Sequence, residues 1–364
     1  MNERVLSLDV FRGMVIVLMI VVNYQLSTAA YPMLLHAPWN DCSVADLVFP
    51  GFLFIVGMTC VVALKQHQIE DKKKIIYSIM SRSGILILLG LFLNAYPFFI
   101  WSQLRYYGIL QRIAVCYFFC VLIYLNTTVK TQIALFILII GSYWIVLTQI
   151  PVPGVGANQL TTVGSWVSYI EQLLFSPDHL FGKTYDPEGF LSTIPALATT
   201  LSGLVAGQLV FNTQYSRPKK WLFMFGAALL CLLFGWLWHY DFPLNKSLWT
   251  SSFVLWTSGW SLLLFSFCYL LIDILGYTRW STAFKLFGVN ALFAFIVHVL
   301  LIKMQLYYKI ETKQGIYSVK GYILSFFFKY WSGSNAVLIY SLVFLLINFG
   351  LVYWLYKKKI FIKI

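Results

Sequence analysis

The segment SLDVFRGMVIVLMIVVN, residues 7–23, is an apolar run that also carries charged and amide side chains. A helix of about 20 apolar residues crosses a hydrocarbon core of ~30 Å. Asp9 and Arg12 are three residues apart, so they share a helix face and can pair. At 100° per residue Asn23 returns to within ~20° of Arg12, about 16 Å further along the axis. We therefore predict a spanning helix whose polar stripe faces a bundle interior or cavity. A structural Asp–Arg pair and one interhelical amide bond would explain the same stripe.

Apolar runs of this kind recur along the whole chain of 364 residues, which is 60% hydrophobic and 11% charged, with a mean hydropathy of +0.78. Soluble domains are about 25% charged, and a membrane β-barrel would show short alternating segments instead. We predict an all-α polytopic membrane protein that forms one transmembrane domain over residues 1–364. The ten predicted spans are residues 5–25, 45–65, 78–98, 107–126, 132–150, 190–211, 221–239, 249–273, 283–302 and 335–356.

The distribution of Lys and Arg predicts the orientation, because these residues gather on the cytoplasmic side of membrane proteins. Arg4, the loop 65–74, the RPKK segment 217–220 and the basic C-terminal tail all fall on one side. We therefore expect both termini in the cytoplasm, and we interpret the net charge of +13 as this signal rather than as a nucleic-acid site. Five lysines fall on the predicted outer side instead: Lys303, Lys309, Lys313, Lys320 and Lys329. An additional re-entrant or interfacial helix within 316–331 would change the count there to eleven.

The loop HAPWNDCSVAD, residues 36–46, joins the first two predicted spans and contains His36. Histidine changes charge near neutral pH and serves as a general base or acyl carrier. The pattern S-x-x-D of Ser43 and Asp46 is also an ordinary helix cap, as is the DPEG turn that begins at Asp186. No zinc-protease or serine-hydrolase motif is present, and we predict no metal site.

Six blocks in order along the chain resemble the heparan-α-glucosaminide N-acetyltransferase family of transmembrane acyltransferases. They are SLDVFRGMVIVLMIVVN (7–23), HAPWNDCSVADLVFPGFLFIVG (36–57), RYYGILQRIAVCY (105–117), DPEGFLSTIPA (186–196), NKSLWTSSFVL (245–255) and GVNALFAFIVH (288–298). The resemblance implies transfer of an acetyl group from cytoplasmic acetyl-CoA to the amine of a glucosamine-type sugar on the outer side. Six residues precede the first block, which suggests a bacterial-type member without the N-terminal luminal domain of the lysosomal enzymes. We accordingly expect an inner-membrane protein whose active-site mouth faces the periplasm or the exterior.

On this resemblance the catalytic residues are His36, Asn23 and Asp46. His36 would act as general base, or would carry the acetyl group as acetyl-histidine. Asn23 would orient His36 or stabilise the oxyanion, and Asp46 would hold the imidazole tautomer or only cap the helix.

Binding residues follow from the resemblance and from predicted depth. The candidates for acetyl-CoA are Arg12, Arg82, Gln111, Arg112 and Lys285. The candidates for the sugar or glycan acceptor are Trp39, Asn40, Asp186, Glu188, Asn290 and His298. Arg105 and Arg112 could bind an anion, and an interfacial anchor with the neighbouring tyrosines explains them equally well. For Asp186 and Glu188 a helix start is the plainer explanation. The partners are the lipid bilayer and these two substrates, and a homodimer is left open.

Two other functions use the same features. An envelope polysaccharide O-acyltransferase would share the topology and differ in the acceptor. A transporter of a sugar or amphiphile would use the polar face of the first helix as its pathway, although inverted repeats typical of transporters are not evident.

Overall fold

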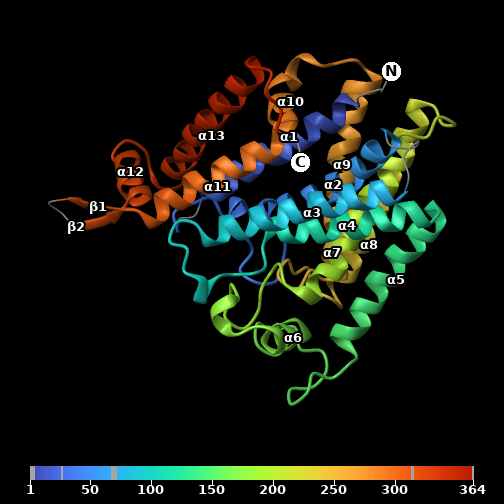
Figure 1. Cartoon of the computed structure of the whole chain (residues 1–364), viewed down its shortest axis with the longest axis horizontal. Coiled ribbons are helices and arrows are strands. Elements are labelled where there is room, and N and C mark those ends of the chain that lie inside the picture. Colours follow the sequence, from blue (N-terminus) through green and yellow to red (C-terminus); the bar gives the residue numbers. More distant parts are fainter. Residues whose placement is uncertain (1–4, 26–27, 67–71, 313–314, 363–364) are drawn as a thin grey trace.

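The computed structural model describes residues 5–25, 28–66, 72–312 and 315–362, and it is built mainly of helices (Figure 1). Arg4, Lys313 and residues 67–71 of the predicted basic loop lie outside the described residues.

The long helices follow the apolar runs of the sequence. They are α1 (Leu6–Tyr24), α2 (Val48–Gln66), α3 (Lys72–Ala95), α4 (Ile109–Asn126), α5 (Val129–Thr148), α7 (Phe190–Val210), α8 (Arg217–His239), α9 (Ser251–Tyr269), α10 (Thr282–Val289), α11 (Ala291–Tyr307) and α13 (Gly333–Lys357). Within the described ranges nine helices are long and apolar enough to cross a membrane, and α10 with α11 makes a tenth if the bent pair counts as one span. The predicted all-α polytopic fold with about ten spans is confirmed. The cytoplasmic placement of the termini stays a prediction.

The predicted span 283–302 is a broken one, because the chain bends by 73° between α10 and α11. Asn290 lies at the break, outside helical geometry at φ −114° and ψ 41°. Its side chain binds the C-terminal segment: Nδ2 donates to the Ile360 carbonyl at 3.3 Å, and Oδ1 accepts from the Ile362 amide at 3.2 Å. These tertiary hydrogen bonds stabilise a break in a run that has no Pro.

Two loops contain short elements of their own. The predicted outer loop 151–189 contains α6 (Trp166–Leu174). After α11 the chain forms an antiparallel hairpin of β1 (Lys309–Thr312) and β2 (Gly315–Ser318), in which Lys309 pairs with Ser318. A helix does lie within 316–331, namely α12 (Val319–Phe328), and its ten residues are too few to span a bilayer.

The alternation of long helices creates two ends of the bundle, which we call the terminal face and the loop face. The terminal face contains the start of α1 and the residues after α13, and Figure 1 marks both chain ends there. The loop face contains the segments 28–47, 96–108, 149–189 and 240–250. These segments bind one another, for example through the amide of Asp41 and the carbonyl of Leu244 at 2.8 Å.

Several helix pairs touch backbone to backbone, and two of these pairs include α1 or α2. An added Cβ on Gly13 of α1 would lie 1.7 Å from the Phe284 carbonyl oxygen of α10. An added Cβ on Gly57 of α2 would lie 1.9 Å from the Thr200 carbonyl oxygen of α7. Small residues permit such close approach of membrane helices, so these glycines fix the spacing of the helices that carry the polar residues.

Candidate active site

Asp46 is buried at the loop face and uses its two carboxylate oxygens for different partners. Oδ2 accepts hydrogen bonds from the amides of Ser43 (3.1 Å) and Ala37 (3.0 Å) and from the Ser43 hydroxyl (2.9 Å). Oδ1 lies 2.8 Å from Nδ1 of His36. The capping box at the start of the 3₁₀ turn Val44–Leu47, which leads into α2, is present. The Asp46 carboxylate therefore caps this turn and contacts His36 at the same time.

Lys246 is the third member of this cluster, and it was not among the residues predicted from the sequence. Its Nζ lies 3.3 Å from Asp46 Oδ1 and 3.1 Å from His36 Nδ1. The only sequence signal for it was its place in the block NKSLWTSSFVL.

Nδ1 of His36 has two contacts that favour different positions of the proton in the neutral ring. Asp46 Oδ1 can only accept and favours a proton on Nδ1, whereas the Lys246 ammonium can only donate and favours a lone pair there. The Asp46 contact is the shorter one, at 2.8 Å against 3.1 Å, and the carboxylate can accept from Nδ1 and from Lys246 together. The neutral ring that satisfies Asp46 has a lone pair on Nε2, on a side chain that is 44% exposed beside a carboxylate side chain that is 1% exposed.

Two neighbours of His36 attach the loop to the rest of the loop face. The Trp39 indole donates to the Leu160 carbonyl at 2.8 Å, and Asn40 Oδ1 accepts from Asn245 Nδ2 at 3.3 Å. These contacts attach the loop three and four residues after His36, and the predicted role of Trp39 and Asn40 toward an acceptor stays a prediction.

Asn23 pairs with a different histidine from the one expected. Its Nδ2 lies 2.9 Å from Nε2 of His298, which is fully buried in α11. Nδ1 of His298 lies 3.3 Å from the Ala294 carbonyl, one helical turn earlier. The carbonyl requires a proton on Nδ1 and the amide donor requires a lone pair on Nε2, so His298 is held neutral. The roles expected for Asn23, to orient His36 or to stabilise the oxyanion, stay predictions, and the side-chain contact that Asn23 makes is with α11.

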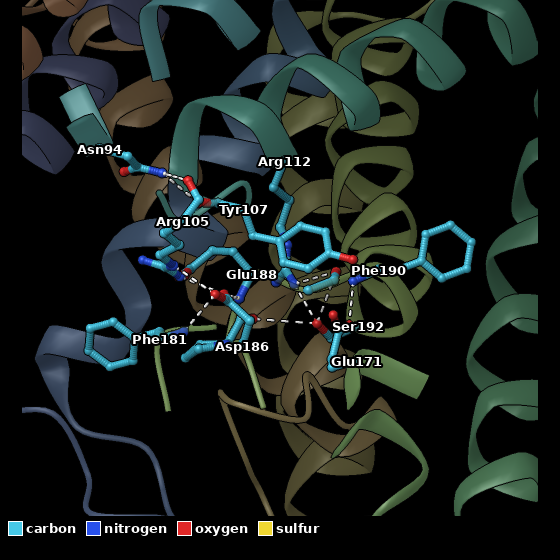
Figure 2. Close-up of polar contacts among 12 residues, drawn as sticks. Asn94, Arg105, Tyr107, Arg112, Glu171, Phe181, Asp186, Glu188, Phe190 and Ser192 are labelled. Carbon is cyan, nitrogen blue, oxygen red and sulfur yellow. Dashed lines mark hydrogen bonds and ion pairs between the residues drawn. The ribbon is translucent and has the colours of Figure 1, made fainter. Parts of the chain in front are cut away.

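Arg105, Asp186 and Glu188 form a partly buried ionic cluster (Figure 2). Arg105 donates from Nε and Nη2 to Asp186 at 2.7 and 2.5 Å, and it also pairs with Glu188. Asp186 is fully buried and accepts from the amides of Phe181 and Glu188 as well. Burial alone would lower the pKa of Arg105, but the carboxylates of Glu188 and Asp186 raise it. These partners account for Asp186 as a structural group that ties two loops together, and its predicted role toward an acceptor gains no support from the geometry.

Arg112 lies beside this cluster, at the loop-face end of α4. It is 2% exposed and donates to the Gly189 carbonyl at 3.2 Å and to the Ser192 hydroxyl. Its guanidinium carbon lies 5.0 Å from the centre of the Trp249 ring. Figure 2 shows Arg112 reaching from α4 toward Ser192 at the start of α7.

Glu171 of α6 caps the same helix start. Its Oε1 accepts from the Phe190 amide at 2.6 Å, and the Tyr107 hydroxyl lies nearby (Figure 2). Burial raises the pKa of the Glu171 carboxyl to about 7, against the opposing effect of these hydrogen bonds.

The five donor-site candidates do not lie together. Arg12 contacts Asp9 at 3.4 Å and donates to the Gly288 carbonyl at 3.0 Å, near the terminal face. Arg82 lines a small cavity between α2, α3 and α4 together with Tyr117, and Lys285 lies in α10.

Gln111 and Arg112 occupy the opposite end, because α4 starts at the loop face. One set of CoA phosphates therefore cannot use all five candidates. Asn290 also lies near the terminal face, where its side chain binds the C-terminal segment, so its predicted acceptor role has no support from its position.

The described residues include no group of three or more His, Cys, Asp or Glu side chains arranged to hold a metal ion.

Comparison with known proteins gives a consistent result. Residues 4–236 match the family model described as heparan-alpha-glucosaminide N-acetyltransferase, catalytic. The chain is 28% identical over 353 residues to heparan-alpha-glucosaminide N-acetyltransferase of Homo sapiens, covering 81% of this chain and 52% of that protein. It is 27% identical over 363 residues to the Mus musculus protein of the same name, covering 82% and 54% respectively. The chain thus spans about half the length of the curated relatives it matches.

Proposed function

Because the chain belongs to the heparan-α-glucosaminide N-acetyltransferase catalytic family, we propose that it transfers an acetyl group from acetyl-CoA to the amine of a glucosamine-type sugar. The observation that carries the proposal is the pair of His36 and Asp46 at 2.8 Å, in which a neutral, half-exposed ring that donates from Nδ1 has Nε2 available as a base. A neutral imidazole in this state is the group that an amine needs in order to lose its proton.

The proposed reaction is a direct transfer. The amine nitrogen attacks the thioester carbonyl while Nε2 of His36 takes the amine proton, and a tetrahedral intermediate forms. The carbon–sulfur bond then breaks, and the CoA thiolate takes the proton from Nε2. The products are the N-acetylated sugar and CoA–SH. Asp46 keeps the ring oriented and stabilises its transient positive charge.

We also propose that the loop face is external and the terminal face is cytoplasmic. Several cations of the loop face have internal partners and therefore add little surface charge. Arg105 and Lys246 pair with buried carboxylates, and Lys303 donates to the carbonyls of Leu93 and Tyr96 at the end of α3. The basic residues of the terminal face then determine the orientation.

The test is a transfer assay in lipid nanodiscs with radiolabelled acetyl-CoA and glucosamine. We expect label in the sugar with the wild type and a loss of at least 100-fold in His36→Ala. His179→Gln is the matched control: it lies on the same face, and glutamine can still donate to the Leu104 carbonyl that His179 contacts at 2.7 Å.

Full activity of His36→Ala would refute the site assignment. Transfer to N-acetylglucosamine as well as to glucosamine would indicate O-acylation instead. Isolation of labelled enzyme without an acceptor would indicate an acetyl-histidine intermediate.

A further inference from the structure

We propose, resting on the proposed function, that Lys246 is a positioning residue that keeps His36 in its base form and prevents the protonated ring from accumulating during turnover. Lys246 would act through Asp46 and through its own charge, not by touching either substrate.

The first argument is that Asp46 does not need a cation for its hydrogen bonding. Its oxygens already accept from Ala37, from Ser43 twice and from His36. Because Asp46 already accepts these hydrogen bonds, the main contribution of Lys246 is its positive charge. That charge lies 3.1 Å from Nδ1 of His36 and 3.3 Å from Oδ1 of Asp46. Its electrostatic effect on the histidine is therefore as direct as its effect on the carboxylate.

The second argument is that the loop carrying Lys246 is held firmly. Asn245 is buried, and its Oδ1 accepts from the Leu248 amide at 2.8 Å. Trp249 is fully buried in the left-handed region at φ 53° and donates to the Thr199 hydroxyl at 3.1 Å. A bulky residue at positive φ is costly and persists only where its surroundings impose it. Arg112, stacked near the Trp249 ring, is one of the groups that impose it, so the position of Lys246 is set by the fold.

The third argument concerns the charges around Lys246. The titratable groups that face it are His36, Cys42 and Asp46 from the loop 36–46, and Glu188 from the DPEG turn. Burial alone would raise the pKa of Glu188, but Arg105, Arg112 and Lys246 lower it.

Asp46, which pairs with Lys246 at 3.3 Å, balances the charge of the ammonium while His36 is neutral, because Glu188 already pairs with Arg105. When His36 takes a proton, a second positive charge appears next to the ammonium, and repulsion favours its release to the leaving thiolate.

The test measures the protonation of His36 without requiring catalysis. Diethyl pyrocarbonate modifies neutral imidazole, so mass spectrometry of the His36 peptide over pH 4–9 gives the midpoint of its protonation. We expect the midpoint in Lys246→Met to lie about one pH unit above wild type, as the loss of a unit charge near a partly exposed ring predicts. Lys246→Arg should restore the wild-type midpoint. Lys309→Met, which removes an exposed positive charge from β1 on the same face, should leave it unchanged.

In the transfer assay Lys246→Met should lower kcat by up to tenfold at neutral pH, since a midpoint shift of one pH unit reduces the neutral fraction of the ring by at most that factor. It should change the KM for glucosamine less than twofold. An unchanged or lower midpoint in folded Lys246→Met would overturn the proposal, and so would a loss of activity that is the same at every pH and is not rescued by Lys246→Arg. If Lys246→Met does not fold, the protonation midpoint of His36 is compared between Lys246→Gln and the wild type instead. A midpoint shift without any acetyl transfer by the wild type would support the role of Lys246 and refute the proposed function instead.

Discussion

At the scale of single residues, Asp46 has two roles, one in the stability of the fold and one in the proposed chemistry. The hydrogen bonds to Oδ2 stabilise the turn into α2, and the contact of Oδ1 orients His36. Substitutions can therefore separate folding from chemistry at one position of the chain.

Ser43→Ala removes one donor to Oδ2 and should cost about 1 kcal/mol of unfolding free energy, with less than a tenfold loss of transfer rate. Asp46→Asn keeps the volume but removes the charge that selects the tautomer, and it should lower kcat at least 100-fold. Thermal unfolding and the transfer assay on both variants measure these effects. Equal losses of activity in the two variants would contradict the division of tasks.

Asn23→Ala should leave the Nε2 acceptor of His298 unpaired inside the bundle and lower the unfolding free energy by about 1–2 kcal/mol. The matched control is Asn126→Ala, because Asn126 donates only to the Leu122 carbonyl of its own helix at 2.8 Å. Comparison of their thermal midpoints with that of the wild type provides the measurement. A smaller effect at Asn23 than at Asn126 would argue against a structural pair.

The sequence indicated some of these contacts because they are local. His36 and Asp46 are ten residues apart in one capping loop, so their proximity followed from the loop itself. Lys246 is 210 residues from His36, and no spacing rule connects them. The direction of the polar stripe on α1 was predictable, but its partner His298 depends on how α11 packs.

At the scale of helices, hydropathy predicted where the spans lie, because each is a long apolar run. The bend between α10 and α11 could not be predicted in this way. The run 282–307 is mostly apolar across the break, and the hydrogen bonds that stabilise the break come from residues 360 and 362.

The glycine contacts give a prediction for pairs of helices. Gly57→Ala and Gly203→Ala should each force α2 and α7 apart and lower the unfolding free energy by at least 2 kcal/mol. Gly84→Ala is the control, since no atom lies within 4 Å of its added Cβ in α3, and a gain of up to about 1 kcal/mol is expected there. Thermal unfolding in one detergent tests all three. A neutral result at both Gly57 and Gly203 would contradict the close packing.

The docking of α6 on α7 should depend on pH through Glu171. Its folded pKa of about 7 lies above its ordinary value of 4.5, so the folded state binds this proton more tightly than the unfolded state. The stabilisation from this proton is complete below about pH 4.5 and is lost as the pH rises through 7. Glu171→Gln keeps an acceptor for the Phe190 amide and removes the proton equilibrium.

The thermal midpoint of the wild type should therefore fall relative to Glu171→Gln between pH 5 and pH 8. Parallel curves for the two proteins over this range would show that Glu171 titrates normally.

At the scale of the whole molecule, the two faces should be accessible from opposite sides of the membrane. Lys309→Cys on the loop face should react with a membrane-impermeant maleimide in intact cells. Gln214→Cys, in the short connection between α7 and α8 on the terminal face, should react only after the membrane is opened. The comparison is best made in a background where the partly exposed Cys42 is replaced by serine. The reverse pattern would invert the proposed orientation.

The glycine contacts also have a mechanical consequence. α1 with α10 and α2 with α7 are each in backbone contact, whereas α1 and α2 are kept apart by a side chain, since an added Cβ on Gly51 would lie 3.5 Å from Val15. In the first two contacts main-chain atoms set the spacing, so a larger residue at the glycine requires a whole helix to move. At the α1–α2 contact a rotation of the Val15 side chain can accommodate the added methyl group, so Gly51→Ala should be tolerated better than Gly13→Ala.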